Sequence, residues 1–314
     1  MPKRFDTVVV GSCVMDLLCG PVLLDAPIGA GTLHNIQPPR ALPGGITSNA
    51  GIAMRRLGLR VAVASYVGDD AWGTLLRDTL VREGVETQHL AIHPDAPTST
   101  TVVLVDEHAE RSFLHAQGAP KRIDAAFFRE RMDLWRNTGW MLLGYYPLLP
   151  NLIDDLPDVM RELRAAGCKT ALDSAGGKTR GGSLEALAPV LPYMDLYIPS
   201  LGEAQTQTGE DDPKRMVTRY RKAGAAGIVG VKLGGADGVL LSQSPGNFHH
   251  QPSAKPPGPV IDTTGAGDCF LAGLIAGLSQ SRSIKDAAAL GCKAAAQSVT
   301  QWGGWAGVQR VTPA

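Results

Sequence analysis

The stretch Asp262-Thr-Thr-Gly-Ala-Gly-Asp268 is the most informative part of the sequence. It precedes an apolar segment, residues 269–278, whose composition predicts a helix. Three small residues therefore lie where a loop turns into a helix, and the free N–H groups of a helix start favour a bound phosphate. Because Asp268 stands beside them as a proton acceptor, we interpret the stretch as a phosphoryl-transfer site. The simpler alternative is a structural loop in which Asp268 only caps the helix.

Short apolar runs alternate with helical patterns along the rest of the chain. This alternation favours a mostly parallel sheet with helices on both faces. Residues 98–105 and 111–115 predict a hairpin that stands apart as an edge or a flap. The other predicted strands are 7–10, 61–67, 140–143, 170–172, 196–198, 228–233 and 239–241, the predicted helices are 49–57, 71–83, 152–166, 201–208, 214–223, 269–278 and 284–300, and the predicted loops are 21–45 and 245–259.

Composition and charge exclude several classes of protein. Lys+Arg and Asp+Glu are 30 each among 314 residues, so the formal net charge is zero, whereas nucleic-acid and membrane-surface partners require a basic patch. The five cysteines include no Cys-x-x-Cys pair, which argues against a zinc or redox site and fits a reducing cytoplasm. We expect no signal peptide and no membrane span, since no apolar run approaches 18 residues.

Four further motifs lie upstream of residues 262–268. They are Gly44-Gly45-Ile-Thr-Ser-Asn49, Arg56-Leu-Gly-Leu, Val67-Gly-Asp-Asp-Ala-Trp-Gly73 and Lys232-Leu-Gly-Gly-Ala-Asp-Gly238. Taken singly, each has a simpler explanation: the glycine pair is a turn, Asn49 caps the helix that it opens, and Asp16 is an ordinary loop acid. In this order, the motifs make the chain resemble the PfkB (ribokinase-like) carbohydrate kinase family over nearly its whole length.

The resemblance implies a ribokinase-like three-layer α/β/α sandwich with a mostly parallel sheet and a small β-sheet lid. One kinase domain would span residues 1–314, with the lid formed by about 12–45 and 96–120. The implied activity is ATP-dependent phosphorylation of a hydroxyl on a small sugar or sugar-like molecule, with lid closure excluding water. A homodimer is expected as well, because symmetric dimers are common.

The resemblance also assigns roles to individual residues. Asp268 is the base, and the backbone of Gly265, Ala266 and Gly267 is the anion hole. The substrate is bound by Asp16, Gly44, Gly45 and Asn49, with Tyr145 and Arg111 as further candidates. The nucleotide is bound by Lys232, Gly234, Gly238, Ser200 and Cys292. Glu203 holds Mg²⁺ through water, while Asp262 and Thr264 are candidates for a monovalent cation, K⁺, as in some members of the family.

Three positions depart from the family pattern. The Asn-x-x-Glu motif appears as Ser200-Leu-Gly-Glu203, so that a hydroxyl replaces an amide. The nucleotide loop opens with Lys232 in place of Thr, and this lysine is either solvated or reaches the ATP phosphates. Tyr145 or Tyr146 stands where ribokinases have a sugar-contacting Glu, which would suit a less polar ring or a nucleoside.

Three other functions stay open at this point. A nucleoside kinase would use the same scaffold. A phosphosugar kinase would need cations near the far end of the substrate, for which Arg111, Lys121 and Arg122 are the candidates. A sugar or nucleotide sensor fits less well, since it has no need of Asp268.

Three other patterns carry no function. Gly177-Lys-Thr is not a phosphate-binding P-loop, because Leu172 stands where that motif requires Gly. Gly265-x-Gly267 is not a dinucleotide fingerprint, because Phe270 stands at the third Gly position. The adjacent His249 and His250 are assigned to a solvated loop and not to a metal site.

Overall fold

A computed structural model describes residues 3–24, 31, 33–107, 110–174 and 181–311, so the rejected P-loop pattern at 177–179 lies outside the described residues. The strands of the larger sheet are β1 (Phe5–Gly11), β4 (Val61–Val67), β5 (Glu86–Ile92), β8 (Thr138–Gly144), β9 (Lys169–Asp173), β10 (Leu196–Tyr197), β11 (Ile228–Gly234), β12 (Gly238–Ser244) and β13 (Asn247–Gln251). Their order is β13-β12-β11-β10-β9-β8-β1-β4-β5. The strands from β11 to β5 run parallel, and β12 and β13 extend one edge in antiparallel pairing.

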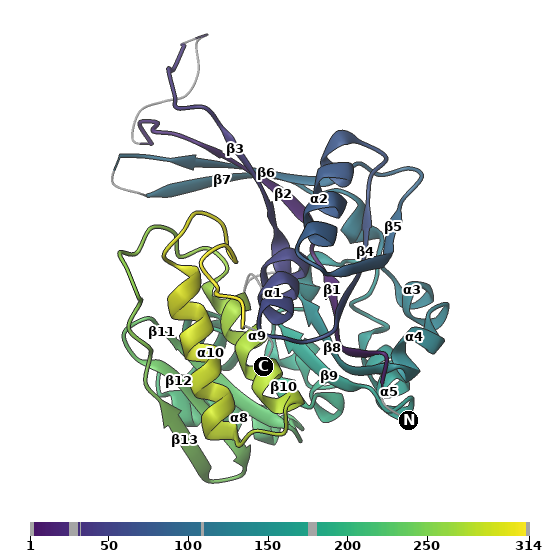
Figure 1. Cartoon of the computed structure of the whole chain (residues 1–314). Helices are drawn as coiled ribbons and strands as arrows, with labels where there is room; N and C mark the ends of the chain where they lie inside the picture. The colour runs from purple at the N-terminus through teal and green to yellow at the C-terminus, as the bar shows by residue number, and fades with distance from the viewer. Residues whose placement is uncertain (1–2, 25–30, 32, 108–109, 175–180, 312–314) are drawn as a thin grey trace.

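A second, smaller sheet projects from this body (Figure 1). Its strands are β2 (Val14–Cys19), β3 (Arg40–Gly44), β6 (Ser99–Val105) and β7 (Arg111–Ala116), in the order β3-β2-β6-β7. Strands β6 and β7 pair in antiparallel orientation, which confirms the predicted hairpin. The first and last pairs are antiparallel, whereas β2 and β6 run parallel because the long connection through the larger sheet separates them in sequence.

Helices cover both faces of the larger sheet, because side chains of a strand point alternately to its two faces. Val9 of β1 belongs to one core, while Val8 and Val10 belong to the other. The first core packs against α1 (Gly45–Arg56), α2 (Ala71–Arg82), α9 (Ala266–Ser279) and α10 (Ile284–Ser298). The second packs against α3 (Ala125–Arg129), α4 (Met132–Arg136), α5 (Leu156–Ala165), α6 (Leu184–Leu187), α7 (Leu201–Thr208) and α8 (Pro213–Lys222). Short 3₁₀ turns are η1 (Ala119–Arg122), η2 (Tyr146–Leu148) and η3 (Leu191–Tyr193). The predicted three layers are therefore confirmed.

Helix α1 begins at Gly45 and not at Asn49, where the sequence predicts its start. The backbone N–H and the hydroxyl of Thr47 both donate to the carbonyl of Ser12, which ties the first turn to the end of β1. Asn49 therefore lies inside the helix, and the interpretation of Asn49 as the cap is wrong. Its side chain is free for a tertiary contact.

Two predicted loops contain strands: β3 lies within residues 21–45 and β13 within 245–259. His249 and His250 are therefore part of an edge strand, and the prediction of a solvated loop is wrong. His250 Nε2 lies 2.7 Å from the carbonyl oxygen of Asp237. The side chains of β13 are mostly half-buried, so the strand has only a weak hydropathy pattern. This explains why the sequence does not predict β13.

Some helix bounds also differ from the prediction. The helix predicted over residues 152–166 begins at Leu156, because Pro157 suits the first turn and not the interior of a helix. Strands β2 and β5 and the short helices α3, α4 and α6 are not among the predicted elements. In the described part of the chain, no helix combines the length and the apolar character that crossing a bilayer requires.

Helices α9 and α10 approach each other closely through glycine. A Cβ atom added to Gly273 of α9 would lie 2.7 Å from the Cα of Gly291 in α10, so neither backbone leaves room for a side chain. This contact fixes α9 against α10, and α9 carries Asp268 in its first turn. The position of Asp268 therefore depends on helix packing one to two turns away.

We expect Gly273→Ala to lower the free energy of unfolding by about 1–3 kcal/mol, because a methyl group would overpack the α9–α10 contact. The midpoint of urea unfolding measures this change. Gly202→Ala is the matched control: Gly202 lies exposed in α7, and a Cβ atom there would meet nothing within 4 Å. Equal midpoints for the two variants would contradict the role of the close contact.

Candidate active site

The candidate residues gather at the carboxyl ends of the parallel strands. Tyr145 directly follows β8, Asp173 ends β9, and Lys232 lies near the end of β11. Asp268 reaches the same edge from the first turn of α9. Open parallel sheets bind ligands at this edge, because the loops that follow the strands converge there.

Asp268 is almost fully buried, with 3% of its surface exposed. Its Oδ2 atom accepts hydrogen bonds from Asn49 Nδ2 at 2.9 Å and from the Tyr145 hydroxyl at 2.7 Å. Burial and the negative charge of Asp173 raise the pKa of Asp268 to about 6, while the two hydrogen bonds and Lys232 oppose the rise. In its ionised form, this carboxyl group can accept a proton.

The backbone of Tyr145 is left-handed, with φ 58° and ψ 37°. Such a conformation costs a non-glycine residue about 1–3 kcal/mol. Two backbone hydrogen bonds hold it: Tyr145 N–H donates to the Asp173 carbonyl, and Leu148 N–H donates to the Tyr145 carbonyl. Burial and the charge of Asp268 raise the pKa of Tyr145 well above its ordinary value, so its hydroxyl remains a donor.

Asp16 and the glycine pair lie on the small-sheet side of Asp268. A Cβ atom on Gly44 would lie 1.9 Å from Asp16 Oδ2, so the carboxylate rests directly on the glycine backbone. Burial, together with the charges of Asp262 and Asp268, raises the pKa of Asp16 to about 7, and a hydrogen bond with Thr101 opposes this rise. Gly45 then starts α1, so the two glycines join the small sheet to the helix that carries Asn49.

The loop before α9 brings small residues together at the helix start. Gly265 is the N-cap residue, with φ 69° and no side-chain cap, so the interpretation of Asp268 as a cap is wrong. A Cβ atom on Gly265 would lie 2.7 Å from the Cα of Gly304. Ala266 and Gly267 form the first turn, whose N–H groups have no partner within the helix itself; the Ala266 N–H donates to the Thr263 carbonyl at 3.3 Å.

Lys232 is not solvated, contrary to one of its two interpretations. Its Nζ atom lies 2.8 Å from Asp173 Oδ1, and the two side chains are only 14% and 4% exposed. Burial alone would lower the pKa of Lys232, but Asp173 and Glu203 raise it. Asp173 is absent from the sequence-predicted site; its signal is an acid directly after the apolar run 170–172.

A cavity of about 440 Å³ opens on the other side of the α9 start. Its lining includes the predicted residues Lys232, Gly234, Gly238, Ala266, Gly267 and Cys292, and the apolar residues Pro256, Val260, Phe270, Ala295, Ala296 and Val299. The apolar walls of this cavity suit the flat base of a nucleotide. Lys232 and the start of α9 suit its anionic phosphates.

Ser200 and Glu203 form a capping box at the start of α7. Glu203 Oε2 accepts from the Ser200 N–H at 2.7 Å and from its hydroxyl at 2.8 Å. Among the described residues, no three or more His, Cys, Asp or Glu side chains gather closely enough to hold a metal by themselves. Mg²⁺ commonly keeps several waters and uses one or two carboxylates with substrate phosphates, so Glu203, whose charge acts on Lys232 in the cavity lining, fits a water-mediated role.

Arg111 reaches from β7 to the loop before α9. Its NH1 atom lies 2.8 Å from Asp262 Oδ1 and 2.6 Å from the Thr264 hydroxyl. Asp262 Oδ1 also accepts from the Thr264 N–H, and Oδ2 accepts from the Gly303 N–H. The side chains of Asp262 and Thr264 therefore bind a guanidinium in this structure, and a monovalent cation beside these residues stays a prediction.

Comparison with known proteins gives the site a context. A family model described as "pfkB family carbohydrate kinase" matches residues 4–309. The chain is 30% identical over 271 residues to the fructoselysine 6-kinase of Escherichia coli K12, which covers 86% of this chain and 94% of that protein. It is 29% identical over 298 residues to the fructokinase of Klebsiella pneumoniae, covering 86% and 83%.

Solved structures share the fold. A probable sugar kinase from Rhizobium etli CFN 42 superposes with a TM-score of 0.82 at 21% identity, over 99% of this chain and 96% of that one. The Arabidopsis thaliana ribokinase, solved with ribose and ATP, gives a TM-score of 0.81 at 23% identity, over 96% and 94%. The predicted ribokinase-like fold is therefore confirmed.

We expect Asp16 to make stability depend on pH. The folded protein holds this proton up to about pH 7, whereas an unfolded Asp loses it near pH 4, so the free energy of unfolding falls as pH rises between these values. Asp16→Asn removes that fall. The free energy of unfolding at pH 8 minus that at pH 5 should therefore be higher in the variant than in the parent chain, by roughly 1–3 kcal/mol.

Urea unfolding at the two pH values measures this difference. Asp95→Asn, at an exposed turn, is the control and should leave the pH dependence unchanged. A pH dependence of Asp16→Asn identical to that of the parent chain would contradict the burial of a titrating carboxyl at this position.

Proposed function

Because the chain belongs to the pfkB family of carbohydrate kinases, which are phosphotransferases with an alcohol group as acceptor, we propose that it transfers the γ-phosphate of ATP to a hydroxyl of a small sugar. The observation that carries the proposal is the place of Asp268. Its carboxylate is almost fully buried, its chain neighbour Gly267 lines the 440 Å³ cavity together with Lys232, and its charge acts on Asp16. A base at this position would lie close to both reactants.

The residues around Asp268 suggest the course of the reaction. Asn49 and Tyr145 both bond Oδ2, so we assign proton acceptance to Oδ1. The substrate O–H proton passes to this oxygen as the hydroxyl oxygen bonds to the γ-phosphorus and the bond to the β-phosphate oxygen breaks, releasing ADP. The N–H groups at residues 265–267 stabilise the charge of the transferring group.

Lys232 adds a positive charge on the nucleotide side. Its Nζ atom would lie 3.3 Å from a Cβ atom placed on Gly267, and therefore beside the start of α9. Asp173 holds the ammonium group in place. Magnesium, when bound near Glu203, would supply further neutralisation of phosphate charge.

The small sheet would act as a lid over the acceptor. With Arg111 bonded to Asp262, the cavity beside Asp16 measures about 20 Å³, which is room for about one water. A sugar reaches Asp268 only when the sheet moves away from the loop before α9. The expected homodimer remains a proposal; Phe113 and Leu114 on β7 are more than half exposed and would suit a contact between lids.

The alternative functions differ in the support that they have. For a phosphosugar kinase, Arg111 is engaged with Asp262, while Lys121 and Arg122 lie in η1, which packs against β4. No contact of the described residues favours a nucleoside over a sugar in the 20 Å³ cavity. A sensor would have no use for a buried, ionised carboxylate beside a helix start.

Asp268→Asn tests the assignment of the base. We expect sugar-dependent ADP release to fall by on the order of 10²–10⁴-fold, because the amide cannot accept the hydroxyl proton. Binding of ATP, measured by calorimetry, should stay within about twofold, since the nucleotide cavity keeps its lining. Asp78→Asn, exposed on α2, should match the parent chain. Near-parental turnover of Asp268→Asn would sink the proposal.

Tyr145→Phe tests whether the phenol tunes the base. The hydrogen bond from Tyr145 lowers the pKa of Asp268, so its loss raises that pKa and moves the acid limb of the kcat/KM profile to higher pH. The other groups that act on Asp268 are Asn49, Asp173 and Lys232, and these are unchanged in the variant.

Tyr146→Phe provides the matched control for the pH profile. Tyr146 is also buried, but its hydroxyl donates to the Gly181 carbonyl and belongs to the second core. We expect its acid limb to coincide with that of the parent chain. If both variants shift the limb equally, or neither does, Tyr145 does not act on the base.

A further inference from the structure

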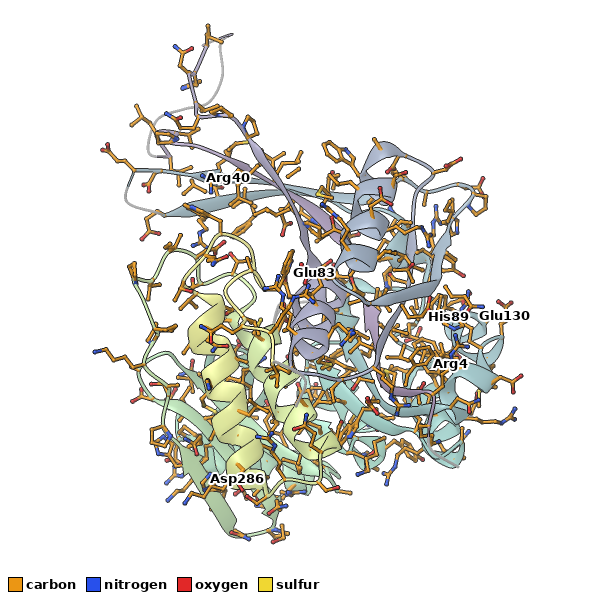
Figure 2. All side chains as sticks on the ribbon, viewed as in Figure 1. Arg4, Arg40, Glu83, His89, Glu130 and Asp286 are labelled. Atoms are coloured by element: carbon orange, nitrogen blue, oxygen red, sulfur yellow. The ribbon has the colours of Figure 1, made fainter. Side chains whose placement is uncertain are left out.

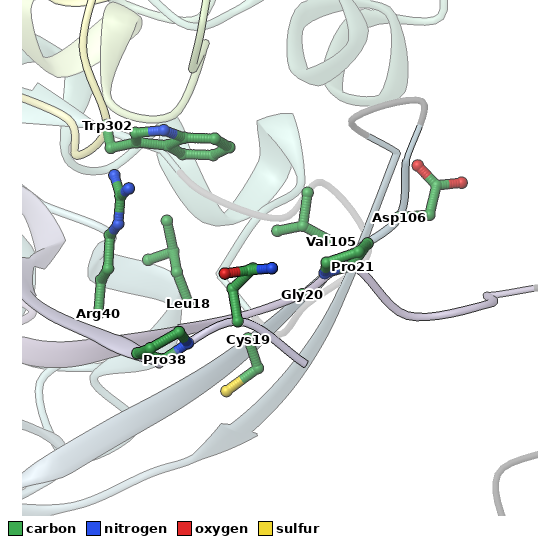
Figure 3. A pocket seen from close by; sticks show the side chains of 10 residues that line it. Leu18, Cys19, Gly20, Pro21, Pro38, Arg40, Val105, Asp106 and Trp302 are labelled. Atoms are coloured by element: carbon green, nitrogen blue, oxygen red, sulfur yellow. The ribbon is translucent and has the colours of Figure 1, made fainter. Parts of the chain in front are cut away.

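A third cavity adjoins the 20 Å³ cavity beside Asp16, at the outer end of the small sheet. It has a volume of about 240 Å³ and lies between the small sheet and the C-terminal loop that contains Trp302 (Figure 3). Leu18 and Val105 line both this cavity and the 20 Å³ cavity beside Asp16. A substrate seated with one hydroxyl at Asp268 would therefore extend along β2 toward it. We name this cavity the outer cavity.

Arg40 gives the outer cavity a positive charge. It is paired across the strands with Leu18, and its guanidinium carbon lies 5.8 Å from the centre of the Trp302 ring. Figure 2 shows Arg40 on the small sheet, and Figure 3 shows its guanidinium directed toward the ring. Among the residues that the structure describes, no acid lies within ion-pair distance of Arg40. Arg111, by contrast, is neutralised by Asp262.

The remaining lining of the outer cavity is largely apolar. It includes Leu18, Pro21, Pro38 and Val105, which suit a carbon chain. Asp106 lines the end away from Arg40 (Figure 3). A phosphate group carries a charge of about −1.5 to −2 and would meet a single cation here, whereas a carboxylate of charge −1 is matched by one guanidinium.

We propose that the outer cavity is a substrate subsite that binds a carboxylate at the end of the sugar opposite to the phosphorylated hydroxyl. This inference rests on the proposed kinase function and names its substrate class: a sugar derivative that carries a carboxylate. A sugar acid and an amino acid joined to a sugar share that chemistry. Arg40 is the residue that would bind the carboxylate, and Trp302 holds its guanidinium in position.

The experiment measures ADP release by the full chain with ATP, Mg²⁺ and four classes of acceptor. These are neutral sugars, sugar acids, sugar–amino acid conjugates and sugar phosphates. We expect a carboxylate-bearing acceptor to give the highest kcat/KM, and the second and third classes distinguish its source. The variants are Arg40→Gln, Arg40→Lys and a control, Arg4→Gln.

Arg4 is a matched control, because it is also exposed and also lies over an aromatic ring, at 4.9 Å from the centre of Phe5. For the carboxylate acceptor, Arg40→Gln should raise KM by about 10- to 100-fold with kcat within about twofold, since it removes a charge-assisted contact remote from the reacting atoms. Arg40→Lys should recover part of the loss, and Arg4→Gln should change nothing. The KM of a neutral sugar should be the same in all four proteins.

Three results would overturn the subsite while leaving the kinase function intact. These are a preference for neutral sugars, a preference for sugar phosphates, and a KM for the carboxylate acceptor that does not respond to Arg40→Gln. Absence of acceptor-dependent ADP release in every class would overturn the proposed function itself, and the subsite with it. Urea unfolding of Arg40→Gln at the parental midpoint excludes a folding defect as the cause of a raised KM.

Discussion

The Oδ2 atom of Asp268 accepts hydrogen bonds from two elements that are far from it in sequence, α1 through Asn49 and the turn after β8 through Tyr145. A buried carboxylate without such partners would be strongly destabilising, because burial removes its hydration. The fold therefore has to deliver both donors to one point. It does so by placing α1 and α9 on the same face of the sheet and by ending β8 directly beneath them.

The ion pair between Asp173 and Lys232 also acts on Asp268. Asp173 raises the pKa of Asp268, and Lys232 opposes the rise while pairing with Asp173 at 2.8 Å. Three charges thus share one nearly dry site, in which burial first and the charge of Asp173 second raise the pKa of Asp268. Asp173 ends β9 and Lys232 lies near the end of β11, so the order of the strands brings these two charges together, while α9 adds Asp268 from its first turn.

The sequence predicted those parts of the site whose residues are close together in the chain. Residues 262–268 combine small residues, a helix start and an acid within one turn, and the structure has them as one unit. The role of Lys232 was ambiguous because its partner, Asp173, is 59 positions away, and only the parallel pairing of β9, β10 and β11 makes them neighbours. Tyr145 was expected to contact the substrate. Its hydrogen bond to Asp268 depends on a left-handed backbone, which a hydropathy pattern does not reveal. The sequence did not predict β13 either, because this edge strand is only half buried and its hydropathy pattern is weak.

The Arg111–Asp262 pair also determines how the contact between the small sheet and the loop before α9 responds to salt. Moving the small sheet outward separates a guanidinium from a carboxylate when both are largely shielded from water. Dissolved ions screen such a buried pair much less than an exposed one, so added salt would weaken this contact between the small sheet and the loop before α9 only slightly. In the proposed kinase, an ATP molecule bound before any sugar would face a cavity with space for about one water, so the contact that delays the sugar would also limit hydrolysis of the nucleotide.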